Sequence, residues 1–596
     1  MNPEAWLIFS IAKWRKGGSF MGQKAIRVEN LAQAYLTLLK ERGIDYFFAN
    51  AGTDFAPLIE AFAFYAKEGN KVPKPVAVPH ENVAVAMAHG YYLVTGKPQV
   101  VMVHVNVGTA NAINGIINAA REHIPILFTA GRTPLTEAGL PGSRNLYIHW
   151  SQETFDQASM VREYVKWDYE LRNLFQLEDA VDRALEIAMA EPRGPVYLTL
   201  PREVLAEPQS EFTISSPWRR HTGDRFYPNP QSIKTTAAII ASARNPLIIT
   251  SNSGRNPETV KHMVDLAETF AIPTVTFNPR YMCFPTNHPM HVGFSPDSFF
   301  DNADVVLVVD SDVPWYPDIK KPSKDCRVIH MGIDPFYRNY PMRSFPCDLA
   351  IQSDSSVAIP LLTEALYKQR YRFQARIMDR YERVETIHKE QRRAWRRALE
   401  NVRHSSPLDP IWVSHCINEI KDEHTIIFNE YDLIFSQVEF TEPGTFFGNP
   451  ASGGLGWGLG ASLGASIGAR NRLVIAAVGD GSYMFGNPTP SHFVSHALGI
   501  PILIVVFNNS CWNAVRQAVM GMYPSGWAAK AGLFPLSDLK PSPHYEKIVS
   551  ASDGYGERVE KASDVQPALE RALKAVRDEG RQAVLNMICK PPRSFP

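Results

Sequence analysis

One stretch near the end of the chain, residues 472–516, constrains the fold more than any other part of the sequence. It contains two apolar runs rich in β-branched residues, Leu473–Val478 and Ile500–Phe507, each as long as a buried strand. The segment between them has helical character, so the stretch predicts a strand-helix-strand unit. In such units the carboxyl ends of the strands border the crevice in which ligands bind.

Polar residues follow both runs at that crevice. The first run ends in Gly479-Asp480-Gly481-Ser482 and the second in Asn508-Asn509. A carboxylate and side-chain amides are hard oxygen ligands, and Mg²⁺ is usually held by one or two carboxylates together with phosphate oxygens. Glycines beside Asp480 let main-chain amides approach phosphate closely. The sequence therefore predicts that this crevice binds a magnesium-bound diphosphate.

The spacing of these groups resembles a known motif. GDG followed after 26 residues by NN is similar to the thiamine-diphosphate motif of the family that includes benzoylformate decarboxylase and acetolactate synthase. The glycine-rich Ser452-Gly453-Gly454-Leu455-Gly456 lies just upstream, as in that family. The resemblance covers roughly residues 26–592, and it implies thiamine diphosphate and Mg²⁺ as cofactors.

The resemblance also implies roles for individual residues. Asp480 and Asn509 would bind Mg²⁺ through their side chains, and Cys511 would bind it through its carbonyl oxygen. Gly454 would border the cofactor, and Leu455 would prop it into a bent form, although a leucine at a turn can equally be a core residue. Such enzymes hold the cofactor between the first domain of one subunit and the third domain of another, which implies a homodimer or homotetramer.

Composition limits the partners and the compartment. At about 150 residues per domain, 596 residues make three to four domains. The 61 basic and 61 acidic residues cancel, so nothing favours nucleic acid or an anionic membrane as a partner. The six cysteines form no CxxC pair, and no apolar run approaches the ~20 residues that span a bilayer. These features predict a cytoplasmic protein, and the resemblance implies that it binds a small-molecule substrate.

The order of strand-like and helix-like segments predicts an α/β fold with three doubly wound parallel-sheet domains. Met21 also fits a translation start, which would leave residues 1–20 outside the protein. The expected divisions are an N-terminal extension (1–25), a pyrimidine-binding domain (26–204), a linker (205–232), a middle domain (233–366), a charged helical linker (367–405) and a diphosphate-binding domain (406–596).

Glu81 is the candidate for cofactor activation. It follows a buried strand and opens a helix, and the segment from His80-Glu81-Asn82 to Gly90-Tyr91 resembles the family's signature around its catalytic glutamate. In the family that carboxyl group exchanges a proton with the pyrimidine ring of the cofactor. Taken alone, Glu81 could instead favour the helix N-terminus electrostatically.

Three residues resemble groups that contact substrate in benzoylformate decarboxylase. Thr53, at the end of Phe48-Ala49-Asn50-Ala51-Gly52-Thr53, stands where that enzyme has an active-site serine. His104, before Gly108-Thr109-Ala110-Asn111-Ala112, stands where it has a histidine that shuttles protons, a task for a ring that can donate and accept. His288 resembles its second active-site histidine, but acetolactate synthases use a His-Pro there differently. Structural roles for these residues stay open.

The segment after Asn509 bears on the reaction. Trp512-Asn513-Ala514-Val515 lacks the glutamate that pyruvate decarboxylases place there, and their paired adjacent histidines are not found, so simple acetaldehyde formation is less favoured. Residues 511–517 are similar to acetolactate synthase. Trp512 would border the cofactor or substrate, although large aromatic residues are more often part of a core. The resemblance therefore implies a 2-oxo acid decarboxylase or a decarboxylating carboligase.

Other interpretations remain. The loop 521–545 and the basic residues of 590–593 could meet coenzyme A, which keeps a 2-hydroxyacyl-CoA lyase open. A catalytically silent, cofactor-binding regulatory relative is a further alternative, although it would most naturally have lost Glu81. Whether the middle domain binds FAD or ADP is undecided, because Ser251-Asn252-Ser253-Gly254 is a weak nucleotide signal.

Overall fold

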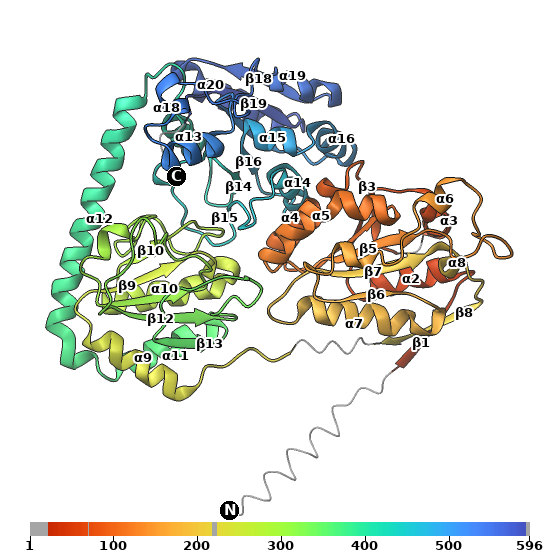
Figure 1. Cartoon of the computed structure of the whole chain (residues 1–596), viewed down its shortest axis with the longest axis horizontal. Coiled ribbons are helices and arrows are strands. Elements are labelled where there is room, and N and C mark those ends of the chain that lie inside the picture. The colour runs from red at the N-terminus through yellow and green to blue at the C-terminus, as the bar shows by residue number, and fades with distance from the viewer. Residues whose placement is uncertain (1–21, 70, 217–222, 592–596) are drawn as a thin grey trace, which may run out of the picture.

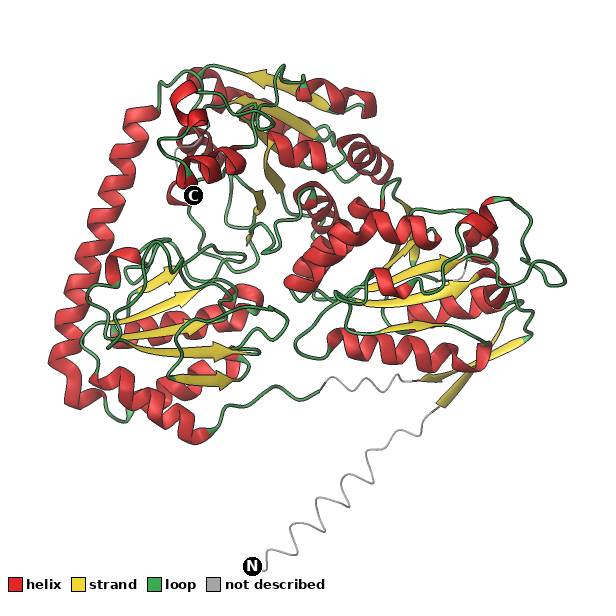
Figure 2. Ribbon diagram, in the orientation of Figure 1, coloured by secondary structure: helices red, strands yellow, loops and turns green. Residues whose placement is uncertain are grey.

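The computed structural model describes residues 22–69, 71–216 and 223–591. Figure 1 shows three lobes, and Figure 2 shows a sheet with helices on both faces in each lobe. Every strand pair in these three sheets is parallel. The prediction of three doubly wound parallel-sheet domains is confirmed.

The first domain has a six-stranded sheet in the order β3-β2-β4-β5-β7-β6. Helices cover both of its faces, so the strand Val100–Val103 is buried along its whole length. The strands are β2 (Tyr46–Ala49), β3 (Lys74–Ala77), β4 (Val100–Val103), β5 (Leu127–Arg132), β6 (Asp168–Glu170) and β7 (Val196–Pro201). The helices are α2 (Leu31–Glu41), α3 (Ala56–Glu68), α4 (Glu81–Thr95), α5 (Val105–Arg121), α6 (Ile148–Ser151), α7 (Leu177–Met189) and α8 (Arg202–Leu205).

The middle domain has a five-stranded sheet in the order β10-β9-β11-β12-β13. Its elements are β9 (Pro246–Thr250), β10 (Thr274–Thr276), β11 (Val305–Val309), β12 (Arg327–Gly332), β13 (Leu349–Gln352), α9 (Pro230–Ser242), α10 (Pro257–Phe270) and α11 (Ser355–Tyr367). The charged helix α12 (Gln374–Val402) then runs along one side of the molecule to the third domain (Figure 1). Its buried Arg380 donates to the main-chain oxygen of Ala271. This charged segment is therefore a helix anchored on the middle domain.

The third domain has a six-stranded sheet in the order β15-β14-β16-β17-β19-β18. Its strands are β14 (Ile426–Glu430), β15 (Phe446–Phe447), β16 (Val474–Gly479), β17 (Leu503–Asn508), β18 (Tyr555–Val559) and β19 (Ala583–Ile588). Its helices are α13 (Pro410–Ile420), α14 (Trp457–Gly468), α15 (Asp480–Phe485), α16 (Pro488–Leu498), α17 (Asn513–Met522), α18 (Trp527–Ala531), α19 (Tyr545–Ile548) and α20 (Ala562–Arg577). The strands β14, β16 and β17 are neighbours, so their carboxyl ends meet at one edge.

The first and third domains pack through α4 and α14, which lie side by side (Figure 1). The two backbones approach so closely that a Cβ on Gly90 would collide with the main-chain oxygen of Ala461. A Cβ on Gly464 would likewise collide with the oxygen of Met87. Both helices contribute to one hydrophobic core that joins the two sheets. Glycine at these positions therefore sets how closely the two domains pack.

The structure differs from the expected boundaries at both ends of the first domain. The strand β1 (Gly22–Arg27) pairs antiparallel with β8 (Glu211–Ser216), so the end of the expected extension and part of the expected linker form a two-stranded sheet. The apolar residues Phe212 and Ile214 of β8 are buried against the first domain. Residues 1–21, on which the question of the start depends, lie outside the described residues. Among the described residues, no helix is both long and apolar enough to cross a bilayer.

Candidate active site

A cavity of about 190 Å³ lies at the carboxyl edge of the third sheet, beyond β14, β16 and β17. All of its lining residues come from the third domain. They are Tyr431, Asp432, Gly453, Leu455, Gly479, Asp480, Gly481, Ser482, Asn509, Cys511, Trp512, Asn513, Ala514 and Val515. The structure thus brings together the residues that the sequence predicts for the metal and the diphosphate, with Gly454 directly beside the lining residue Leu455.

Asp480 is the first residue of α15 and is only 1% exposed. One of its oxygens, Oδ1, accepts the main-chain N–H of Gly481 at 3.1 Å. The other, Oδ2, is buried and has no hydrogen-bond partner among the described residues. Burial raises the pKa of Asp480 to about 7. A buried carboxylate oxygen without a partner is costly, so this atom is suited to bind a ligand that the chain itself does not supply.

Asn509 and Cys511 complete the predicted cation ligands. The Asn509 side chain is oriented by its own loop, because its Oδ1 accepts the main-chain N–H of Cys511 at 3.0 Å. The Cys511 thiol also lies 3.1 Å from Oδ1. A thiol is a weak donor, so a cation at Oδ1 would replace this contact. Both residues line the cavity with Asp480. The donor set is made of oxygens, which suits Mg²⁺.

Asp432 was not predicted, yet it lines the same cavity. It follows β14 in a turn where Tyr431 and Asp432 both have positive φ, 72° and 75°. Burial, and then the nearby charge of Asp480, raise the pKa of Asp432 to about 7. The sequence contains a signal for it, because Asp432 lies two residues beyond the apolar run that forms β14 and therefore at the same edge of the sheet.

Glu430 was also not predicted. It is fully buried, and its carboxylate accepts the main-chain N–H groups of Gly456 at 2.6 Å and Gly458 at 2.5 Å. Burial raises the pKa of Glu430 to about 8. Its carboxylate thus binds the N-terminal amides of α14, where negative charge is favoured. It holds the start of that helix, and with it the glycine-rich turn, against β14.

The glycine-rich turn is bound by the helix α5 of the first domain. Asn118 pairs with the peptide groups of Gly454 in both directions: its Nδ2 donates to the Gly454 oxygen at 2.7 Å, and its Oδ1 accepts the Gly454 N–H at 3.1 Å. One turn earlier, Asn114 donates to the Leu455 oxygen at 3.0 Å. The first domain therefore fixes the backbone that carries Leu455 into the cavity.

Trp512 forms one wall of the cavity. A Cβ on Gly481 would collide with its ring, so only glycine at 481 lets the indole lie across the start of α15. The ring also packs edge to face on Phe485, with centroids 5.7 Å apart. The position of Trp512 in the cavity wall therefore depends on glycine at 481 and on the contact with Phe485.

Glu81 lies at the carboxyl edge of the first sheet, as the first residue of α4. Its carboxylate accepts from the amide of Asn50 at 2.9 Å and from that of Asn111 at 2.5 Å. These two amides come from the ends of β2 and from α5, and they hold the carboxylate in one orientation. Glu81 is not among the residues that line the third-domain cavity of its own chain.

His104 stands immediately before α5 and pairs with a carboxylate that was not predicted. Its Nδ1 lies 2.5 Å from Oδ1 of Asp54, which is 2% exposed. On the other side, the Gln152 amide lies 3.3 Å from His104 Nε2. Asp54 directly follows Thr53 in sequence, so the turn that supplies the candidate hydroxyl also supplies the partner of the histidine. An amide that donates to Nε2 and a carboxylate at Nδ1 favour the tautomer with the proton on Nδ1.

Thr53 lies beside a second histidine. Its Oγ1 is 3.4 Å from Nε2 of His149 in α6, and His149 Nδ1 accepts the main-chain N–H of Asn145 at 3.2 Å. Burial, and then the charge of Arg202, lower the pKa of His149. The neutral ring then carries its proton on Nε2 and can donate to Thr53. The short helix α6 lies in the long connection between β5 and β6, away from any strand end, so no sequence pattern pointed to His149.

His288 lies in the middle domain, away from these groups. Its Nδ1 accepts the main-chain N–H of Met290 at 3.1 Å, and its Nε2 is 3.9 Å from Glu268. Its ring packs on Phe284. None of these contacts reaches the third-domain cavity or His104, so the active-site role of His288 stays a prediction.

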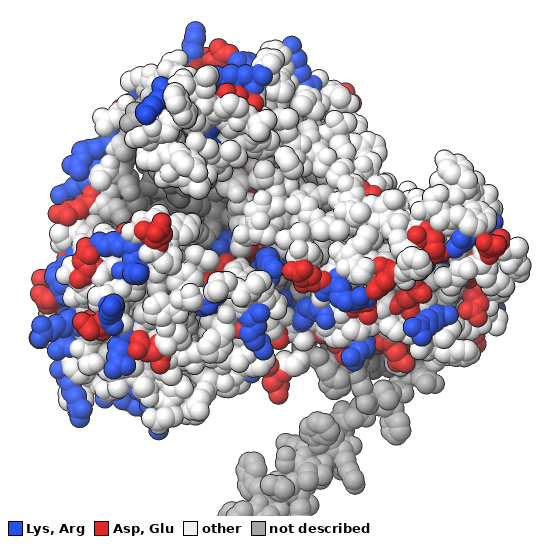
Figure 3. Space-filling model, viewed as in Figure 1, with Lys and Arg blue, Asp and Glu red and all other residues white. Residues whose placement is uncertain are grey.

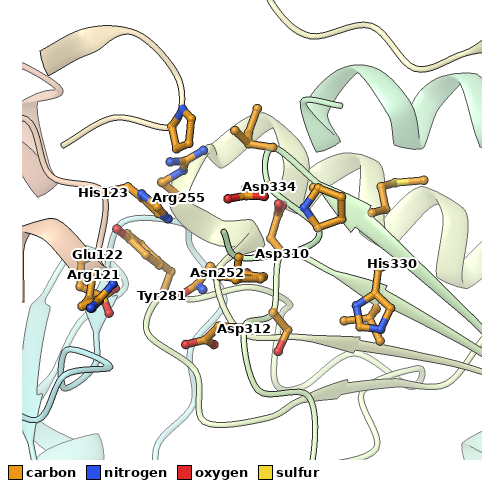
Figure 4. A pocket seen from close by; sticks show the side chains of 18 residues that line it. Arg121, Glu122, His123, Asn252, Arg255, Tyr281, Asp310, Asp312, His330 and Asp334 are labelled. Atoms are coloured by element: carbon orange, nitrogen blue, oxygen red, sulfur yellow. The ribbon is translucent and has the colours of Figure 1, made fainter. Parts of the chain in front are cut away.

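A second, smaller cavity lies at the carboxyl edge of the middle sheet (Figure 4), with a volume of about 40 Å³. The end of α5, at Glu122, covers it from the first domain. Charged pairs border it. Arg280 binds the lining residue Asp312 and lies 3.4 Å from Glu122, while the lining residue Arg255 lies 3.4 Å from Glu191. Several of the charged groups that line this crevice are therefore already paired within the chain.

Comparisons with known proteins agree with this organisation. Residues 29–160, 233–361 and 430–587 match the N-terminal TPP binding, central and C-terminal TPP binding domains of thiamine pyrophosphate enzymes. The matches together cover more than half of the chain, and one lies in each of its three domains. The chain belongs to the thiamine pyrophosphate enzyme family.

Individual relatives are distant but span nearly the whole protein. Benzoylformate decarboxylase of Pseudomonas aeruginosa is 25% identical, over 82% of this chain and 88% of the relative. Sulfoacetaldehyde acetyltransferase of Alcaligenes xylosoxydans xylosoxydans is 24% identical, over 94% and 92%. A 4-hydroxybenzoylformate decarboxylase structure from Rhodococcus jostii RHA1 superposes with a TM-score of 0.75 at 21% identity, over 95% of this chain and all of that one. These names differ in reaction, so they define the class of enzyme and leave its reaction open.

Proposed function

We propose that the protein is a thiamine-diphosphate- and Mg²⁺-dependent enzyme that cleaves a carbon-carbon bond beside the carbonyl of a 2-oxo acid. It would act as a decarboxylase or as a decarboxylating carboligase. The observation that carries the proposal is the third-domain cavity, where the unpartnered Asp480 oxygen, Asn509 and Cys511 surround one space beside a glycine-rich turn. Family membership supports the cofactor, and the donor set supports Mg²⁺.

Each group in the cavity has a distinct task in this proposal. Asp480, Asn509 and the Cys511 carbonyl would hold the cation, and the main-chain amides beside Gly481 would face the diphosphate. Leu455 would support the bent cofactor, because Asn114 and Asn118 fix its backbone. When bound, thiamine diphosphate supplies a carbanion nucleophile and an electron sink.

The first domain would supply the groups that move protons. Glu81 would exchange a proton with the pyrimidine ring, and its two amide contacts keep its carboxylate in a single orientation for that exchange. His104 would donate or accept a proton near the substrate through Nε2, while Asp54 at Nδ1 holds the ring in one orientation. Thr53 would contact the substrate with its hydroxyl.

A second copy of the chain would complete the site. The cavity is lined by the third domain alone, and Glu81 has no contact with it in the same chain. Figure 3 shows a broad surface with few charged side chains across the first and third domains. Exposed large apolar residues of the third domain include Met484, Phe485, Phe493, Val515, Trp527, Leu533 and Leu536, of which Val515 lines the cavity. Clusters of this kind mark interfaces, so we expect a homodimer or homotetramer, which light scattering after size-exclusion chromatography would detect.

The 2-hydroxyacyl-CoA lyase and the silent regulatory relative remain the alternatives. The basic segment that would meet coenzyme A lies partly outside the described residues, and Lys590 is paired with Asp409 at 2.6 Å. No described contact therefore favours the lyase. Glu81, with its two amide partners, argues against a silent relative.

The test is carbon dioxide release from aliphatic and aromatic 2-oxo acids by protein supplied with thiamine diphosphate and Mg²⁺. Glu81→Gln is the control, because it preserves shape while removing the exchangeable proton. Release by the wild type that is lost in the variant supports the proposal, and product mass separates decarboxylase from carboligase. Equal release by both proteins would refute the role of Glu81, and no release from any substrate would favour the lyase.

A further inference from the structure

We propose that Asp432 is a second carboxylate of the cation site, so that the protein binds a divalent cation before the diphosphate arrives. Asp432 follows β14, the strand that pairs with β16, which carries Asp480. Its Oδ2 is 3.5 Å from Nδ2 of the predicted ligand Asn509. A Cβ on Gly479 would lie 3.3 Å from the same oxygen, so Asp432 faces the turn that leads into Asp480.

Charge and burial point to a cation. Asp432 and Asp480 are 7% and 1% exposed, and Asp480 Oδ2 has no partner among the described residues. Of the described residues that line the cavity, none is lysine, arginine or histidine. Two buried carboxylates without a positive neighbour are strongly unfavourable unless a proton or a cation neutralises them.

The donor set favours a hard divalent cation. Two carboxylates, the Asn509 amide oxygen and the Cys511 carbonyl are oxygen ligands on three adjacent loops. The inference rests on the proposed function for the identity of the next ligand, the diphosphate. Without a cation the two carboxylates would repel that anion, so the cation would have to bind first.

The test measures Mn²⁺ binding to cofactor-free protein from the electron paramagnetic resonance signal of the free ion. We expect the wild type to bind one Mn²⁺ per chain without thiamine diphosphate, and Asp432→Asn to bind it at least about tenfold more weakly. Asp432→Glu should retain binding within a few-fold. Asp432→Ser is the second removal variant, and Asp564→Asn, an exposed carboxylate on α20, is the control that should change nothing.

Two results would overturn the inference. One is an unchanged Mn²⁺ affinity in folded Asp432→Asn and Asp432→Ser, and the other is a wild type that binds no Mn²⁺ without the cofactor. A separate arm adds thiamine diphosphate to the wild type and its Mn²⁺. Tighter Mn²⁺ binding there supports the proposed function, whereas no change would refute the cofactor and leave the assignment of Asp432 standing.

Discussion

The third and middle domains both have a cavity at the carboxyl edge of a parallel sheet. The two cavities differ in whether their carboxylates have positive partners. At the third sheet, a cavity of about 190 Å³ holds buried carboxylates with no positive side chain among its described lining residues. At the middle sheet, a cavity of about 40 Å³ is lined by Glu122 and Asp312, two carboxylates that pair with Arg280. The middle edge is capped by α5 of the same chain, whereas the third edge is lined by its own domain alone. The strand ends of such a sheet therefore do not by themselves make a ligand site.

The difference between the two edges indicates what makes a ligand site. Buried carboxylates that lack partners need something from outside the chain, while those that have partners contribute to structure. By this criterion the edge of the third sheet is the stronger candidate for a ligand site, whereas the paired groups at the edge of the middle sheet contribute to its contact with the first domain. The helix α5 reaches both edges, because Asn118 binds Gly454 and Glu122 accepts the main-chain N–H of Ala451 at 2.7 Å beside Arg280.

The largest expected effect on stability comes from removing Arg280, which pairs with Asp312 and Glu122 at the edge of the middle sheet. Arg280→Met would leave Asp312 and Glu122 buried without their positive partner, and we expect the free energy of unfolding to fall by about 3–5 kcal/mol. Urea denaturation would measure this. The control is Arg327→Met, an exposed partner of Asp348, which should cost less than about 1 kcal/mol. Equal losses in both variants would contradict a structural role for the Arg280 network.

A smaller effect is expected at the other end of α5. Asn118→Ala would leave the N–H and oxygen of Gly454 without their partners, a cost of about 1–3 kcal/mol. The turn that carries Leu455 would loosen, so the affinity for thiamine diphosphate should fall about tenfold while Mn²⁺ affinity is unchanged. Calorimetric titration would show this, with the exposed Asn287→Ala as control. Parallel losses of cofactor and cation would show instead that the variant damages the whole cavity.

The pH dependence of stability separates the two edges further. Burial raises the pKa of Asp310 in the middle cavity to about 6, from 3.8. Between pH 4 and 6 the unfolded chain loses this proton while the folded protein keeps it, so stability falls as pH rises through that window. In Asp310→Asn, the free energy of unfolding should therefore fall by about 2 kcal/mol less over this pH range than in the wild type. Urea denaturation at each pH would measure it. An identical pH profile in the variant would show that Asp310 titrates normally.

The smallest effect is an expected absence of flavin binding. A cavity of about 40 Å³ that is bordered by ion pairs is too small for a dinucleotide, which needs a cleft of roughly 300–1,000 Å³. We therefore expect protein that has been incubated with FAD and desalted to show no visible absorbance. A stoichiometric flavin spectrum would mean that the ion pairs of Arg280 separate to admit a ligand. The middle edge would then be a ligand site too, which would contradict the distinction between the two edges.

Much of this arrangement was predictable because it follows local patterns. Apolar runs ending in Gly479-Asp480-Gly481-Ser482 and Asn508-Asn509 place both groups at one sheet edge once the strands are parallel neighbours. Asp432 follows the same logic at the end of β14 and could have been found. The pairing of Asp54 with His104 and the position of His149 depend on how a loop folds back, which no periodicity encodes. The pairing of β1 with β8 joins segments about 190 residues apart and is likewise not a local property.

The most direct test of the account is equilibrium binding of thiamine diphosphate, with and without Mg²⁺, to the wild type and to Asp480→Asn. We predict that the wild type binds the cofactor only when Mg²⁺ is present, and that Asp480→Asn weakens this binding by more than about a hundredfold, since it removes a ligand rather than a supporting group. Cofactor binding that is equally tight in both proteins, or that does not depend on Mg²⁺, would contradict the claim that this cavity is the cofactor site.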